Sequence, residues 1–95
     1  MSELLASFKL TIGDLTPGTE NDAYYQNFIN QAKAQILSND IDETILTETE
    51  LGQSTIVLWA EALMNKRNIA DDPTLLLLRN TLAAQTKGAA YADKS

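Results

Sequence analysis

Hydrophobic residues recur at helical spacing along most of the chain, and β-branched alternation is scarce. The first such segment covers about residues 2–11, where apolar residues follow the three- and four-residue steps of one helix face. Gly13 can end this helix, and Pro17-Gly18 marks a turn in the acidic loop that follows. The apolar positions of this short N-terminal helix are Leu4, Leu5, Phe8 and Ile12.

The second segment has the clearest amphipathic pattern in the chain. Either Asn21 or Asp22 can act as its N-cap, and Ser38-Asn39-Asp40 ends it with residues that favour caps and turns. Residues 41–46 then connect to the next helix, as a single helical turn that holds three apolar side chains against the core. The apolar face of the second helix consists of Tyr25, Phe28, Ile29, Ala32 and Ile36.

The third segment is expected to form a long central helix. Thr47 and Glu50 have the spacing of a capping box, with the threonine as N-cap. The middle of the segment, residues 56–60, is apolar on all sides, which is typical of a helix covered by its neighbours. We expect this helix to continue to about Ala70.

The fourth segment begins with residues that favour the start of a helix. Asp71 or Asp72 can cap it, and Pro73 suits the first turn, where its missing N–H needs no partner. We expect the helix to end near Gly88 and residues 89–95 to form a flexible tail. The sequence therefore predicts an all-α fold, a bundle of about four helices within a single domain of residues 1–88.

Four consecutive leucines, residues 75–78, spread around most of this last helix, because neighbouring residues are about 100° apart. Leu75 and Leu78 share a face with Leu82 and are assigned to the core. Leu76 and Leu77 lie elsewhere, near Ala83 and Ala84 one heptad later. Two interpretations are open for this second surface: burial within the monomer, or contact with a neighbouring protomer. The full predicted core is Phe28, Ile29, Ile36, Leu58, Trp59, Leu75, Leu78 and Leu82.

Composition narrows the possible chemistry. The chain has no cysteine and no histidine, which removes thiolate nucleophiles, imidazole bases and the usual zinc ligands. The net charge is −6, so a cluster of basic residues that binds nucleic acid is not expected. Serines lack an activating partner in the sequence, and no phosphate-binding loop is present. We therefore expect no enzyme activity, no metal and no cofactor.

Two groups of charged residues are candidate sites. Asp40, Asp42 and Glu43 form the densest acidic cluster, but they lack the spacing of an EF-hand loop and suit a solvated acidic surface with helix-capping roles. Lys66 and Arg67 can contact a partner, or they can lie in solvent as cations near a helix C-terminus. No apolar run approaches the roughly 20 residues of a membrane span, and the first residues lack a basic signal-peptide region, so the default expectation is the cytoplasm.

The order of segments resembles that of the head–tail connector (head-completion adaptor) proteins of long-tailed bacteriophages. The stretch SELLASFKLTIGD, an acidic loop and DAYYQNFINQAKAQIL resemble the first half of that family. LWAEALMNKRN resembles its long central helix, and DPTLLLLRNTL resembles its later Pro-started, Leu-rich segment. The resemblance covers about residues 2–83 and consists of degenerate apolar patterns.

Membership of that family would imply a small helical protomer of a ring, possibly of twelve subunits, between the portal and the tail. DNA would pass through the ring without specific binding, and an acidic lumen would repel its phosphates. The protein would then be part of the virion, assembled in the bacterial cytoplasm. The competing hypothesis is a small cytoplasmic regulatory or antitoxin-like helical protein that binds one partner protein.

Overall fold

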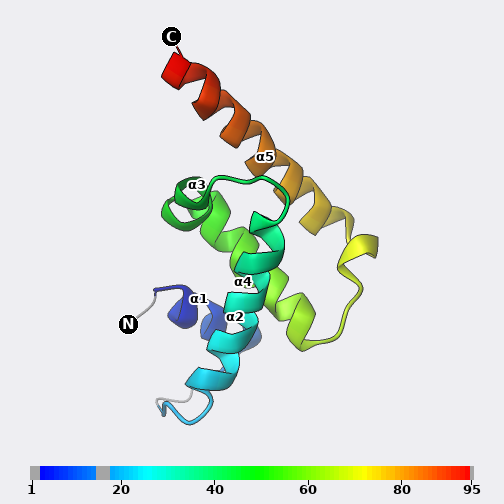
Figure 1. Ribbon diagram of the computed structural model, residues 1–95. Helices are drawn as coiled ribbons and strands as arrows, with labels where there is room; N and C mark the ends of the chain where they lie inside the picture. Colours follow the sequence, from blue (N-terminus) through cyan, green and yellow to red (C-terminus); the bar gives the residue numbers. More distant parts are fainter. Residues whose placement is uncertain (1–2, 15–17, 95) are drawn as a thin grey trace.

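The computed structural model of the protein describes the backbone of residues 3–14 and 18–94, and the side chains of residues 4–14 and 18–88. These residues form five α-helices and one short 3₁₀ helix, with no strand among them, so the predicted all-α bundle is confirmed (Figure 1). The elements are α1 (Glu3–Ile12), α2 (Asp22–Leu37), α3 (Glu43–Glu48), α4 (Glu50–Met64), η1 (Ile69–Asp71) and α5 (Pro73–Lys94).

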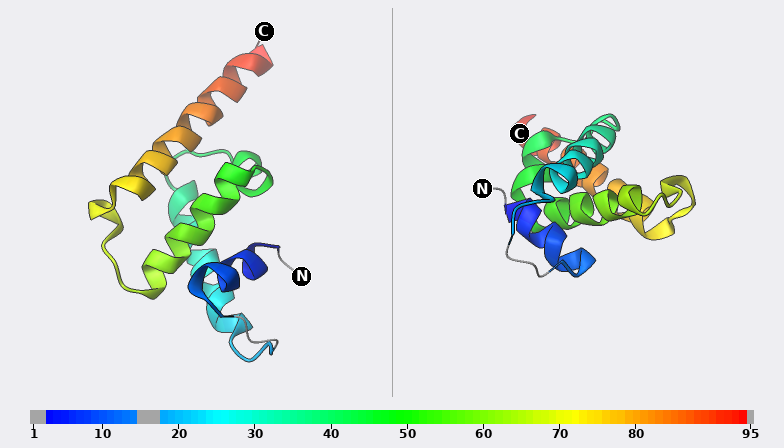
Figure 2. Two further views of the ribbon diagram at one scale, coloured as in Figure 1. Left: turned by 180° about the vertical axis from the view of Figure 1, so that it is seen from behind. Right: turned by 90° about the horizontal axis from the view of Figure 1, so that it is seen from below.

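Helix α4 is the centre of the fold, as the sequence predicted. Helices α1, α2, α3 and α5 all pack against it. Helix α5 runs obliquely across the body, and its C-terminal end projects beyond α3 (Figures 1 and 2). The molecule is accordingly elongated, with principal extents of 48 × 30 × 17 Å.

The core forms where the apolar faces of α1, α2, α4 and α5 meet. Five predicted core residues are buried there: Ile29, Ile36, Trp59, Leu75 and Leu82. The other three, Phe28, Leu58 and Leu78, pack against the core but are only partly buried. Phe8 of α1 and Leu46 of α3 are fully buried as well, so the short helices also contribute to the core.

The C-terminal end of α1 and the start of α5 agree with the sequence. Gly13 has a φ of 80°, and the N–H of Asp14 donates to the carbonyl of Lys9 at 2.8 Å. Because glycine adopts positive φ without a steric penalty, it suits this helix stop. At the start of α5, one carboxylate oxygen of Asp72 accepts from the N–H groups of Thr74 and Leu75, at 3.0 and 3.2 Å.

The predicted start and end of the central helix are wrong. Its N-cap is Thr49 instead of Thr47, because residues 43–48 form α3; the Thr49 hydroxyl accepts from the Gly52 N–H at 3.0 Å. The helix ends at Met64 and not near Ala70. Lys66 has a φ of 56°, and the Arg67 N–H donates to the carbonyl of Ala62 at 2.9 Å, which closes the last turn.

The start of α2 agrees with one of the two expected caps, because Asn21 is the N-cap and Asp22 is the first helical residue. The expected end of α5 is wrong. Helix α5 does not end near Gly88, because it continues through Lys94 over 22 residues. Gly88 is therefore an internal helix position, where no structural feature requires glycine; a Cβ there would meet no atom within 4 Å.

Helices α3 and α4 approach each other very closely at Gly52. A Cβ at this position would lie 2.1 Å from the carbonyl oxygen of Leu46 and 2.6 Å from that of Ile45. Only glycine permits this distance, because both neighbours are backbone atoms that cannot swing away. The close approach fixes the sharp turn by which the chain reverses into the central helix.

Candidate interaction surface

The four leucines of α5 have different environments. Leu75 is 2% exposed and belongs to the core, whereas Leu77 is 66% exposed. Leu78 is half-buried and packs on the core, and Leu76 is half-buried. The sequence left open whether Leu76 and Leu77 are buried within the monomer or contact a neighbouring protomer. The structure excludes burial within the monomer for Leu77 alone.

The alanines that were grouped with these leucines also separate. Ala83 packs partly against the core, so it belongs to the flank of the buried face. Ala84 is exposed. Since Ala84 lies seven residues after Leu77, about 20° away around the helix, the two share the outer face of α5.

The predicted basic pair follows α4 at the surface. Both Lys66 and Arg67 are exposed. A guanidinium nitrogen of Arg67 lies 2.6 Å from a carboxylate oxygen of Glu61, so its charge is partly neutralised by its own chain. Lys66 occupies the left-handed position that ends the helix and has no ion pair within the part of the chain that the structure describes.

The predicted acidic surface lies in the turn between α2 and α3 and at the first residue of α3. Asp40, Asp42 and Glu43 are all exposed there. Asp42 caps α3, with its carboxylate accepting from the Ile45 N–H at 3.1 Å, while its own N–H donates to the Thr86 hydroxyl of α5 at 2.9 Å. Residues 3–14 and 18–94 contain no cluster of three or more acidic, His or Cys residues that could hold a metal.

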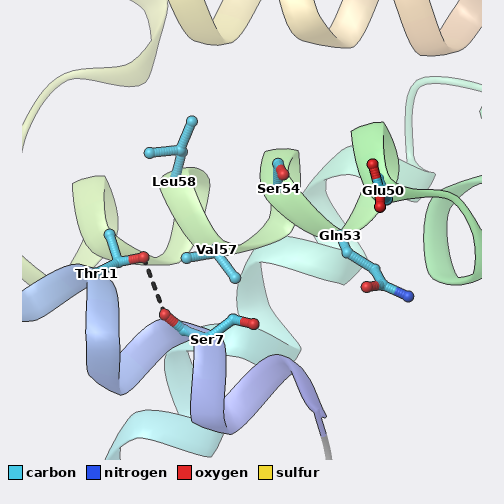
Figure 3. Close-up of a pocket in the computed structure, with 7 residues that line it drawn as sticks. All are labelled: Ser7, Thr11, Glu50, Gln53, Ser54, Val57 and Leu58. Atoms are coloured by element: carbon cyan, nitrogen blue, oxygen red, sulfur yellow. Dashed lines mark hydrogen bonds between the residues drawn. The ribbon is translucent and has the colours of Figure 1, made fainter.

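A groove that the sequence did not predict lies along α4, beside α1. Its volume is about 340 Å³. Figure 3 shows Ser54 and Leu58 on the side of α4 that is turned toward α5, and Thr11 and Ser7 on the facing helix α1. The groove is lined by Ser7 and Thr11 of α1 and by Glu50, Gln53, Ser54, Val57 and Leu58 of α4.

A second hollow, of about 230 Å³, lies between the end of α4 and the start of α5. Leu58 lines both hollows, so they share one apolar point on α4. Both hollows lie along the exposed face of α4, and we call them together the α4 groove. Its lining residues on α4 include Glu50, Ser54, Leu58 and Glu61, which are spaced at helical intervals.

The chemistry of the α4 groove is that of a binding surface. In its first hollow Glu50 is the single ionisable lining residue, and hydroxyls line the same hollow. An isolated exposed carboxylate beside hydroxyl groups can accept hydrogen bonds or attract a cation, but it has no second carboxylate with which to share acid and base roles. The floor of Val57 and Leu58 offers apolar contact.

A polar cluster holds the start of α2 to α1. The Tyr25 hydroxyl donates to a carboxylate oxygen of Asp14 at 2.7 Å, and Lys9 forms an ion pair with Asp22. The hydrogen bond to Asp14, together with burial, raises the pKa of the Tyr25 hydroxyl above its ordinary value of 10.0. The ring of Tyr25 also meets Phe8 edge-on, with centroids 5.5 Å apart. This cluster is structural, since both partners of each contact come from packed helices or their ends.

Aromatic residues do not form a ligand box. Tyr25 and Trp59 are buried, and the indole N–H of Trp59 donates to the Gln35 side-chain oxygen at 2.9 Å. Tyr24 is 55% exposed and stands at right angles to Phe28, with ring centroids 5.0 Å apart. Tyr25 and Trp59 are therefore core residues, as the sequence predicted, whereas Tyr24 is a surface side chain.

Comparison with known protein families, with curated proteins and with solved structures finds no match to this chain. Among the described residues, no helix is long and apolar enough to cross a membrane.

Proposed function

We propose that this protein is a structural protomer that assembles into a ring, as a head–tail connector between the portal and the tail of a long-tailed bacteriophage. The observation that carries the proposal is the exposed Leu77 on a helix whose opposite face is buried in the core. Burying a leucine is worth roughly 1.5–3 kcal/mol, so a protein–protein contact over this residue would be favourable.

The order of elements supports this proposal. A short first helix, an acidic loop, an amphipathic second helix, a central helix and a Pro-started Leu-rich helix follow one another as the family resemblance implied. The elongated form and the projecting α5 suit a protomer whose work is to contact several neighbours (Figure 2). In this role the protein catalyses nothing and needs no cofactor.

The acidic charge of the chain suits a DNA channel that must not bind its cargo. We place Asp40, Asp42 and Glu43 at the lumen, where their exposed carboxylates would repel phosphates and lower friction during passage. A structure of the assembled ring tests this directly. The channel hypothesis is abandoned if these three residues lie on the outer wall.

The proposal is tested by native mass spectrometry of the chain with a candidate portal protein. We expect a high-order ring on the portal, and a monomer or weak oligomer for the chain alone. Leu77→Gln is expected to leave the monomer folded, as measured by circular dichroism, and to impair ring formation. A stable dimer alone, together with no complex on any portal, would instead support the regulatory or antitoxin-like alternative.

A further inference from the structure

The α4 groove and the outer face of α5 are complementary surfaces on the same chain. The groove has an apolar floor at Leu58 and a carboxylate, Glu50, near one end. The outer face of α5 has an exposed leucine, Leu77, near the N-terminal end of the helix and small residues further along it. Neither surface is filled by the protein's own described side chains, so each is available to a second molecule.

The outer face of α5 is suited to close approach. Leu77 is 66% exposed, and Ala84 and Gly88 lie within about 20° of it around the helix. Small residues let a second helix backbone come near, while the leucine supplies the buried apolar area. Lys87 is exposed at the edge of the same face.

Charge distinguishes α5 from the rest of the molecule. Residues 73–94 contain Arg79, Lys87 and Lys94 against Asp93, a net charge of +2. Residues 1–72 contain twelve acidic and four basic residues, a net charge of −8, and the two parts sum to −6. Of the helices that the structure describes, α5 alone has a net positive charge. Electrostatic attraction therefore favours contact between α5 of one copy and the acidic remainder of another.

We infer that the outer face of α5 of one protomer docks into the α4 groove of a second copy of this chain. Leu77 would lie over Leu58, and Lys87 would lie near Glu50. At 1.5 Å per residue, the α5 pair is about 15 Å apart and the α4 pair about 12 Å apart, a difference that a lysine side chain spans. This register requires the two helices to be antiparallel.

This contact deepens the proposed function and rests on it. Because helix face and groove are different surfaces, the contact is heterologous, and each protomer offers one groove and one helix. Such contacts form a ring when the rotation between neighbours closes and an open filament when it does not, so the proposed ring requires a rotation that closes. The inference thus names which surfaces join neighbouring protomers, whereas the proposed function requires only that a ring forms.

Complementary variants test the polarity of the contact. Ser54→Trp fills the groove while leaving α5 unchanged, and Leu77→Glu places an acid on the docking face while leaving the groove unchanged. Both positions are exposed, so the monomer should remain folded. Matched controls are Ala34→Trp and Ala34→Glu, at an exposed position of α2 outside both surfaces.

At a concentration at which the natural chain associates, we expect each of the two variants to lose species above the monomer in native mass spectrometry, with the dissociation constant raised about tenfold or more. An equimolar mixture should form a one-to-one dimer that does not grow, because the intact α5 of Ser54→Trp fits the intact groove of Leu77→Glu. The controls should assemble like the natural chain.

A charge exchange tests the register. Glu50→Lys and Lys87→Glu should each weaken association by about two- to fivefold, the range expected for an ion pair at an interface rim. The two together in one chain should restore it. Losses by the single variants that are as large at high salt as at low salt would contradict an ionic contact.

The outcomes separate the inference from the proposed function. If the natural chain forms rings and both Ser54→Trp and Leu77→Glu still form them, the docking contact is wrong and the ring function stands. If the mixture of these variants stays monomeric while each alone fails to assemble, the heterologous pairing is wrong. If the natural chain never assembles, alone up to its solubility limit or on a portal, both are overturned.

Discussion

Two faces of α4 illustrate how one apolar helix can have two different environments. The inner face meets α2 and α3 and is closely packed, with Gly52, Ile56 and Ala60 buried. The outer face, at Glu50, Ser54 and Leu58, is open along the α4 groove. The inner face is determined by steric fit within the monomer. The outer face has no such constraint, so its partly buried leucine is available to a partner molecule.

The largest expected effect comes from closing the space between α3 and α4. Gly52→Ala would place a Cβ 2.1 Å from a carbonyl oxygen of the backbone, so the two helices must separate. We expect a loss of about 3 kcal/mol or more in unfolding free energy, at the upper end of overpacking effects. Chemical denaturation followed by Trp59 fluorescence measures it.

Gly88→Ala is the matched control for Gly52→Ala. A Cβ at Gly88 meets no atom within 4 Å, and the position is helical. Alanine should therefore stabilise the monomer by about 0.5–1 kcal/mol, the usual difference between these residues inside a helix. A small cost at Gly52 would show that α3 is not held against α4 in the way described.

The second prediction compares the two faces of α5. Leu82 is fully buried, so Leu82→Ala should cost about 2–5 kcal/mol through lost burial and a new cavity. Leu77→Ala, on the outer face, should change monomer stability by less than about 0.5 kcal/mol. Thermal and urea unfolding at low protein concentration measure both. Equal costs would mean that Leu77 belongs to the monomer core after all.

The sequence was sufficient to predict the fold class and most of the inner surface. Helical spacing identified Ile29, Ile36 and Leu82 as core because burial on one face produces that spacing directly. Helix ends were less predictable. Lys66 ends α4 in a conformation for which glycine is the usual signal, and Thr47 has the right spacing for a cap but lies inside α3.

The candidate surface was only partly predictable. The run of four leucines indicated that α5 has more apolar surface than one buried face requires. It did not indicate whether Leu76 or Leu77 is exposed, because the exposure of each depends on where α3 and α4 contact α5. The α4 groove could not be predicted at all, because it arises from the space that α1 and α5 leave between them. Leu58 was predicted as a core residue because its neighbours in the sequence are apolar.

A third prediction concerns the hydrogen bond at the edge of the inner face. The Trp59 indole N–H donates to the side-chain oxygen of Gln35, and Trp59 is 4% exposed. Gln35→Leu removes the acceptor and should cost about 1 kcal/mol of unfolding free energy. Trp59 is the only tryptophan, so its emission should also shift. Gln31→Leu, exposed one turn earlier on α2, should leave both measurements unchanged.

The smallest expected effect is a pH dependence of the unfolding free energy. It arises from the contact between α1 and α2, which lies outside the α4 groove. The protonated Tyr25 hydroxyl donates to Asp14, so folding favours the protonated form and the pKa of Tyr25 is raised above 10.0. The corresponding stability is fully present below pH 10 and is lost as the pH rises from there through the raised pKa.

Tyr25→Phe lacks this contribution, so the difference in unfolding free energy between the natural chain and the variant should be constant at neutral pH and shrink above pH 10. The comparison cancels the titration of the other tyrosines and of the lysines. A difference that stays constant through that alkaline range would mean that the Tyr25 hydroxyl does not bond Asp14 in solution.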